Sequence, residues 1–160
     1  MRTNPEAAAL RIVSKKEVPL LYWTAAAWGL AISFPKDRPD LIADQPIVEG
    51  LIDRARALDE RFDRGAIESF LISYEPSRQG AEGDPYARAR RHFQSALALS
   101  HGELAGPYVT LAQAVSIQQQ NRTEFESLLH RALAIDPDAH PESRLENLVS
   151  QRRALAALAR

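Results

Sequence analysis

Two glutamates, a tyrosine and an arginine form the densest group of side chains in this sequence that could do chemistry. Glu68 and Glu75 are seven residues apart, which places both carboxylates on one face of a helix, and Tyr74 and Arg78 flank the second. In a concave groove this group could contact a partner or the polar end of a ligand. The alternative is an ion pair exposed to solvent, which contributes little to stability.

An enzymatic role for Glu68 or Glu75 is a further alternative, in which a pocket tunes one carboxyl as an acid or base. The sequence offers it no support, because it lacks a nucleophile elbow, a phosphate-binding loop, a His-Glu-x-x-His motif and a dinucleotide fingerprint. The four histidines lack metal-ligand spacing, so we expect each at the surface or a helix end, and there is no cysteine. We therefore predict no catalytic residue, no metal and no cofactor.

A second group of candidate residues is aromatic. Tyr22, Trp23 and Trp28 lie in a stretch without charged residues that runs from Val18 to Pro35. They could line an apolar cavity, or they could fill the core between helices, which is the usual role of large aromatic side chains. Pro, Gly and several Ala interrupt the stretch, so a buried helix is favoured over a membrane span.

Three polar residues follow these aromatic side chains at the predicted end of the same helix. Ser33, Lys36 and Asp37 could form a polar cluster at the mouth of such a cavity. The alternative is local, with Lys36 stabilising the helix C-terminus and Asp37 holding the turn between two prolines. The Arg88, Arg90 and Arg91 run is interpreted as an exposed helix face.

Composition limits the classes of protein to which the chain can belong. It has 160 residues, of which 45% are hydrophobic and 26% charged, and its net charge is −1. These values predict one globular domain with a genuine core. The near-zero net charge gives no support to a nucleic-acid partner or to binding an anionic membrane.

An internal sequence repeat indicates which helices hold these candidate residues. Three amphipathic stretches close with a related phrase, Ala57-Leu58-Asp59, Ala98-Leu99-Ser100 and Ala134-Ile135-Asp136, and Pro137 follows the third. The intervals between the phrases are 41 and 36 residues, against about 34 for a tetratricopeptide (TPR) unit. We expect the small Ala of each phrase at the helix–helix contact, with Leu or Ile filling the seam behind it.

Apolar periodicity and breaker residues predict an all-α fold, a TPR-like α-solenoid of antiparallel helix pairs with about eight helices in a single domain, residues 1–160. Asp44, Asp84 and Asn121 are expected to begin helices, Asn121 as a cap with Glu124 as its acidic partner. The first and last predicted helices have no neighbouring helix on their outer side. Leu148, Leu155 and Leu158 are expected on one face of the last helix. The predicted ranges are 5–14, 18–34, 45–61, 65–75, 85–100, 104–117, 122–135 and 141–159.

Several short sequence segments narrow the prediction from a helical repeat array to one protein family. They are residues 20–29 followed by Ile32-Ser33 and Lys36-Asp37, residues 40–44 with Pro46, residues 65–67 with 70–75, residues 105–109 and residues 132–137. Together they resemble the T-component family of the tripartite ATP-independent periplasmic (TRAP) transporters, from about Leu20 to the C-terminus.

The resemblance implies a role and several partners. It implies a bacterial periplasmic TPR protein that cooperates with a solute-binding protein, the P component, and that self-associates as a trimer. It also implies a pore or groove lined by apolar residues, to which Tyr108, in one of the matched phrases, is assigned as a candidate. Members of this family are often anchored as lipoproteins and are longer at the N-terminus, and the chain as given departs from this pattern by lacking the exported N-terminal part with its lipidated Cys.

A generic TPR adaptor that captures a peptide in its concave groove is the alternative function. Such grooves usually carry Lys and Asn at matching positions of their first helices. Here the corresponding stretches, 20–34, 66–74 and 107–117, are apolar, which argues against peptide clamping.

Overall fold

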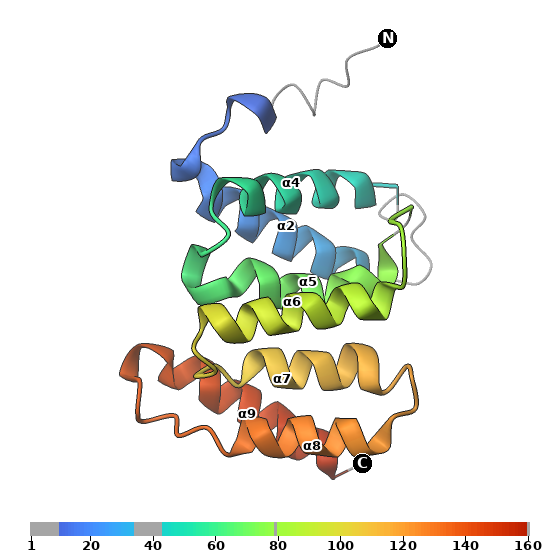
Figure 1. Cartoon of the computed structure of the whole chain (residues 1–160). Coiled ribbons are helices and arrows are strands. Elements are labelled where there is room, and N and C mark those ends of the chain that lie inside the picture. The colour runs from blue at the N-terminus through green and yellow to red at the C-terminus, as the bar shows by residue number, and fades with distance from the viewer. Residues whose placement is uncertain (1–9, 34–42, 79, 160) are drawn as a thin grey trace. The chain divides into compact units, whose positions relative to one another are not determined.

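The computed structural model describes residues 10–33, 43–78 and 80–159, and within these ranges every regular element is helical (Figure 1). The predicted all-α class is therefore confirmed. None of the helices in this part of the chain is long and apolar enough to cross a lipid bilayer. The packing divides the chain into two compact units, residues 1–63 and residues 64–160.

The first unit is built on two packed helices, α2 (Val18–Ser33) and α4 (Gln45–Leu58). A short 3-10 helix, η1 (Lys15–Glu17), precedes α2, and Ser14 and Glu17 form a reciprocal capping box at its start. Arg54 of α4 reaches the chain before this turn, where its Nη2 donates to the Val13 carbonyl oxygen at 2.8 Å. The core between α2 and α4 is formed by Val18, Leu21, Ala25, Val48, Ile52 and Ala55.

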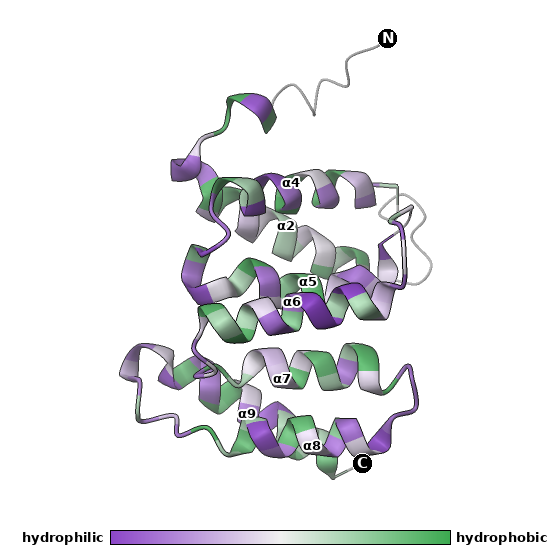
Figure 2. Ribbon diagram, in the orientation of Figure 1, coloured by the Kyte–Doolittle hydropathy of each residue, from purple (hydrophilic) through white to green (hydrophobic). Residues whose placement is uncertain are grey.

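The second unit stacks its helices in chain order. Each of α5, α6, α7 and α8 packs on the helix that follows it, and α9 packs on both α7 and α8 (Figure 1). Along α6 the ribbon alternates between strongly hydrophilic and hydrophobic positions, as expected for a helix with one buried face (Figure 2). The helices are α5 (Ala66–Tyr74), α6 (Pro85–Leu99), α7 (Gly106–Leu111), α8 (Arg122–Leu133) and α9 (Arg144–Leu158). The short elements are the 3-10 helices η2 (Phe62–Gly65), η3 (Glu75–Ser77) and η5 (Pro141–Ser143), with η4 (Ala112–Ser116) continuing α7.

The predicted helix starts follow local side-chain chemistry. Asp84 begins α6, accepting from the backbone N–H groups of Tyr86 and Ala87 at 3.1 Å each. Asn121 begins α8, accepting from the backbone N–H of Glu124 at 3.1 Å, so the predicted cap is confirmed. Asp44 does precede α4, but its side chain makes no capping hydrogen bond.

The repeated phrases do end helices, but the small residue at the contact is a different alanine. Helices α4 and α6 stop at Leu58 and Leu99, and α8 stops just before its phrase, at Leu133. The alanines of the phrases, Ala57, Ala98 and Ala134, are exposed, so the expectation that they form the contact is wrong. The fully buried alanines lie two positions earlier, at Ala55, Ala96 and Ala132. Two residues along a helix is more than half a turn, which explains the exchange of faces.

The range predicted as one helix over 104–117 contains a change of helical geometry. The chain is α-helical over α7 and then adopts a π-helix, η4. There the backbone N–H of Ile117 donates to Ala112 O at 3.2 Å, five residues back, and Asn121 N–H likewise donates to Ser116 O at 2.9 Å. At the N-terminus, the described part of the predicted 5–14 helix is helical at residues 10–12.

Gly65 ends η2 and requires the absence of a side chain. Its φ of +93° lies in the left-handed region, and a Cβ there would lie 3.0 Å from Leu99 Cβ. Glycine therefore lets the start of α5 approach the end of α6 closely.

The last helix, α9, is held to the rest of the second unit through a buried polar residue. Asn147 is fully buried, accepting from the Ala105 N–H at 2.8 Å and donating to the Glu103 carbonyl at 3.0 Å, so it fastens α9 to the start of α7. Four large apolar side chains lie on the exposed side of the helix instead, Leu145, Leu148, Val149 and Leu155, and these form the α9 stripe. The expectation for Leu148 and Leu155 is met, whereas Leu158 packs against the core.

Candidate functional site

The two glutamates predicted to share a face lie in a buried cluster of charged side chains, the charge cluster, which consists of Glu68, Glu75, Arg78, Arg88 and His92. Glu68, on α5, is 0% exposed, and Glu75, at the start of η3, is 3% exposed. His92 of α6 lies between them, with Nδ1 at 2.6 Å from Glu68 Oε2 and Nε2 at 3.7 Å from Glu75 Oε1. A single imidazole thus contacts both carboxylates.

Two arginines complete the cluster around Glu75. Arg88 Nε donates to Glu75 Oε2 at 2.5 Å, and Arg78 Nη1 donates to Oε1 at 3.1 Å. Burial by itself would raise the pKa of Glu75, but the hydrogen bonds and charges of Arg88 and Arg78 outweigh it and lower the pKa below its ordinary value. Arg88 also donates to the carbonyl oxygens of Glu82 and Gly83 at 2.8 Å each, so it holds the loop before α6.

The interpretation of this group as a solvent-exposed ion pair is wrong, because both carboxylates are buried. Two members of the charge cluster were predicted from the sequence to be exposed. Arg88 was expected on an exposed helix face and His92 at the surface, yet their side chains are 12% and 14% exposed. The spacing of α6 carries a signal for His92, since it lies three residues after buried Ala89 and four before buried Ala96.

The geometry of the charge cluster is better suited to holding helices together than to proton transfer. Glu75 is held ionised by two guanidinium groups, whereas a general acid near neutral pH needs a raised pKa. The cluster joins the end of α5 and η3 to the first turns of α6. Within the residues that the structure describes, no group of three or more His, Cys, Asp and Glu side chains is arranged to hold a metal ion.

The two tyrosines predicted for a groove are core residues. Tyr74 is nearly buried at the end of α5 and stacks on Phe70 with ring centroids 5.3 Å apart. Tyr108 of α7 packs edge-on against Phe93 at 5.4 Å, and the guanidinium of Arg131 lies 5.0 Å from its ring centroid. Tyr108 therefore joins α6, α7 and α8.

The aromatic residues of α2 divide between packing and exposure. Tyr22 is half-buried, with its ring 5.1 Å from Trp23 and 5.3 Å from Phe62, and Trp28 is also half-buried. Trp23 is 62% exposed, so it does not fill the core. Ser33 is the last residue of α2. The proposed polar cluster with Lys36 and Asp37 falls largely outside the described residues.

Trp23 belongs to an apolar stripe along the solvent-facing side of α2. Leu20, Trp23, Ala27 and Leu30 are all exposed, and their spacings of three or four residues put them on one face. We call this set the α2 stripe, and it is about 15 Å long. Contiguous exposed apolar surface of this kind marks interaction sites in folded proteins.

Comparison with known proteins places these features in a family. Residues 2–160 match the family described as TRAP transporter T-component. An uncharacterized protein of Treponema pallidum (strain Nichols) is 26% identical over 141 residues, which covers 88% of this chain and 44% of that protein. The chain thus spans less than half the length of this relative. Because the family match extends over nearly every residue, the chain belongs to the TRAP transporter T-component family.

Proposed function

We propose that this TRAP transporter component is a non-enzymatic TPR-like scaffold, one domain over residues 1–160, that docks the periplasmic solute-binding protein through the α2 stripe. Family membership supports the accessory role in a TRAP transporter. The observation that carries the docking proposal is the exposed apolar face of α2, with Trp23 at 62% exposure. This role places the chain in the periplasm, anchored as a lipoprotein in its full-length form.

The α2 stripe has the features of an interface centre. Interface energy is concentrated in a few residues, among which Trp is enriched, and these are surrounded by contacts that exclude water. Trp23 is presented in a fixed orientation because its ring packs edge-on against Tyr22, which in turn contacts Phe62. An anchor that is already ordered loses less conformational entropy on binding.

Self-association uses a different surface in this proposal. Leu145, Leu148, Val149 and Leu155 on α9 are exposed and belong to the second unit. The trimer implied by the family resemblance needs an apolar surface of this kind, and a separate one leaves the α2 stripe available to the solute-binding protein. Binding or passage of a small hydrophobic ligand completes the proposed role.

Light scattering after size-exclusion chromatography tests both surfaces. The chain is measured alone and mixed with the P component encoded beside it, as wild type, as Trp23→Ser and as Leu155→Ser. We expect Trp23→Ser to abolish the mixed complex and leave the homo-oligomer intact. Leu155→Ser should weaken the homo-oligomer and leave docking intact, so each variant is the control for the other.

Two results would overturn the assignment of surfaces. One is a mixed complex formed equally well by wild type and Trp23→Ser. The other is a wild-type chain that stays monomeric and does not bind the P component. Circular dichroism of each variant checks that the helices are intact. We expect Leu155→Ser to change stability by less than about 0.5 kcal/mol, because the side chain is exposed, and Trp23→Ser by less than about 1.5 kcal/mol, because it loses the ring contact with Tyr22.

A further inference from the structure

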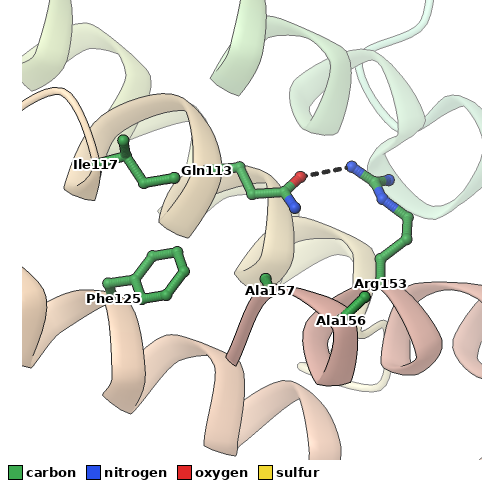
Figure 3. Close-up of a pocket in the computed structure, with 6 residues that line it drawn as sticks. All are labelled: Gln113, Ile117, Phe125, Arg153, Ala156 and Ala157. Atoms are coloured by element: carbon green, nitrogen blue, oxygen red, sulfur yellow. Dashed lines mark hydrogen bonds between the residues drawn. The ribbon is translucent and has the colours of Figure 1, made fainter. Parts of the chain in front are cut away.

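A cleft in the second unit lies between the π-helix, α8 and α9. Its volume is about 450 Å³, within the range of small-molecule sites. Gln113 and Ile117 line it from the η4 segment, Phe125 from α8, and Arg153, Ala156 and Ala157 from α9 (Figure 3). A smaller recess of about 220 Å³ shares Ile117 and Phe125.

The π-helix borders the cleft and precedes one of its apolar residues, Ile117. The segment Ala112–Ser116, with the hydrogen bond from Ile117 N–H to Ala112 O at 3.2 Å, is the only π-helix among the described residues. Ile117 follows that segment and is 51% exposed beside the ring of Phe125 (Figure 3). Single π turns interrupt α-helices frequently at functional sites, where they redirect side chains. The irregular backbone and the cleft therefore coincide.

Arg153 supplies the charged group of the cleft. Its Nη2 donates to Gln113 Oε1 at 2.7 Å, which fixes the guanidinium at the edge of the apolar surface (Figure 3). Within the part of the chain that the structure describes, Arg153 has no carboxylate partner. Arg122, beside the smaller recess, differs because its Nε donates to Glu126 at 2.7 Å. A guanidinium has five N–H donors, so Arg153 keeps donors for another acceptor.

We propose that this cleft binds a small amphipathic monocarboxylate. The carboxylate accepts hydrogen bonds from Arg153, whose planar fork matches that geometry. The apolar part of the ligand covers Ile117, Phe125 and Ala156. A single guanidinium suits a singly charged group better than a phosphate dianion, which usually recruits several donors or a helix N-terminus. The proposal deepens the ligand-binding part of the proposed function and does not depend on docking of the solute-binding protein.

Two-dimensional ¹H–¹⁵N NMR titration of the full chain with sodium octanoate tests the proposal, with 1-octanol as the uncharged probe. We expect saturable shifts of the amides in 113–117, at Phe125 and in 153–157. Arg153→Gln should weaken octanoate binding about tenfold, the loss expected for one charge-assisted contact, and leave octanol binding unchanged. Arg152→Gln, an exposed arginine adjacent in sequence, is the matched control and should bind octanoate as wild type does.

Several results would overturn the proposal. Shifts that map elsewhere or fail to saturate at millimolar octanoate would do so. Equal binding of octanol and octanoate would remove the role of Arg153, as would equal losses in the Arg152 and Arg153 variants. Light scattering of Arg153→Gln with the P component separates this failure from failure of the proposed function, because docking through α2 should persist.

Discussion

Removing Arg88 from the charge cluster tests whether the cluster stabilises the second unit. Arg88→Met keeps most of the aliphatic stem but removes the guanidinium that donates to Glu75 Oε2 at 2.5 Å. Loss of one partner of a buried pair typically costs 3–5 kcal/mol, since the other charge stays buried. Arg78 remains 3.1 Å from Oε1 and offsets part of this loss. We therefore expect a decrease in unfolding free energy of about 3 kcal/mol.

Urea unfolding followed by circular dichroism at the helix minimum measures this change. Arg91→Met is the matched control, because Arg91 is exposed on the same helix, and it should cost less than about 0.5 kcal/mol. Adding Glu75→Gln to Arg88→Met removes the buried carboxylate charge that has lost one of its two arginine partners and should recover at least about 1 kcal/mol. A loss for Arg88→Met no larger than that for Arg91→Met would refute the reasoning, and so would the absence of recovery in the double variant.

Three further predictions concern other features of the fold. Because its arginine neighbours lower the pKa of Glu75, its ionised form contributes stability above its ordinary pKa of 4.5, and this is lost as pH falls through the lower folded value. The urea midpoint should therefore fall less steeply with acid in Glu75→Gln than in wild type, and parallel pH profiles would contradict this. Asn147→Ala leaves the buried Ala105 N–H unpaired and should lower the unfolding free energy, measured in urea, by about 2 kcal/mol. The control Val149→Ala, at an exposed position, should lower it by less than about 0.5 kcal/mol. Equal losses in the two variants would count against a stabilising role of the Asn147 contact. Gly65→Ala should lower the midpoint of thermal unfolding more than Gly83→Ala. Both glycines have positive φ, but only at Gly65 would the added Cβ meet another residue, Leu99, at 3.0 Å. Equal decreases would show that backbone strain alone accounts for the loss of stability.

Much of the fold could be predicted because its signals are local. Asp84 and Asn121 cap their own helices through side-chain hydrogen bonds to residues two or three positions on, so the starts of α6 and α8 follow from short phrases. The helix ends near Leu58 and Leu99 were likewise predicted from the repeated sequence segments at 57–59 and 98–100. The π-helix was not predicted, because a single wider turn leaves no signal in apolar periodicity or helix propensity.

The candidate sites were harder to predict because their contacts join distant positions. The His92–Glu68 contact spans 24 residues and the Arg88–Glu75 contact spans 13, so neither lies within the reach of helix periodicity. Glu68, Glu75 and Arg78 lie in one cluster, whereas Tyr74 of the same predicted group packs on Phe70, and whether the group faced solvent depended on which helix covered it. Arg153 and Gln113 are 40 residues apart, and nothing in their local sequence distinguishes them from other surface residues.

Helix α9 leaves four large apolar side chains exposed, so apolar burial alone does not fix its orientation. Turning this helix by half a rotation about its axis would bury four large apolar side chains, and each fully buried one favours that state by roughly 1.5–3 kcal/mol. The rotated state would remove the Asn147 amide from the Ala105 N–H and the Glu103 carbonyl, leaving both without their partner. The Asn147 hydrogen bonds, together with the core packing of Ala154 and Leu158, favour the observed orientation, and that orientation leaves the leucines available to another surface.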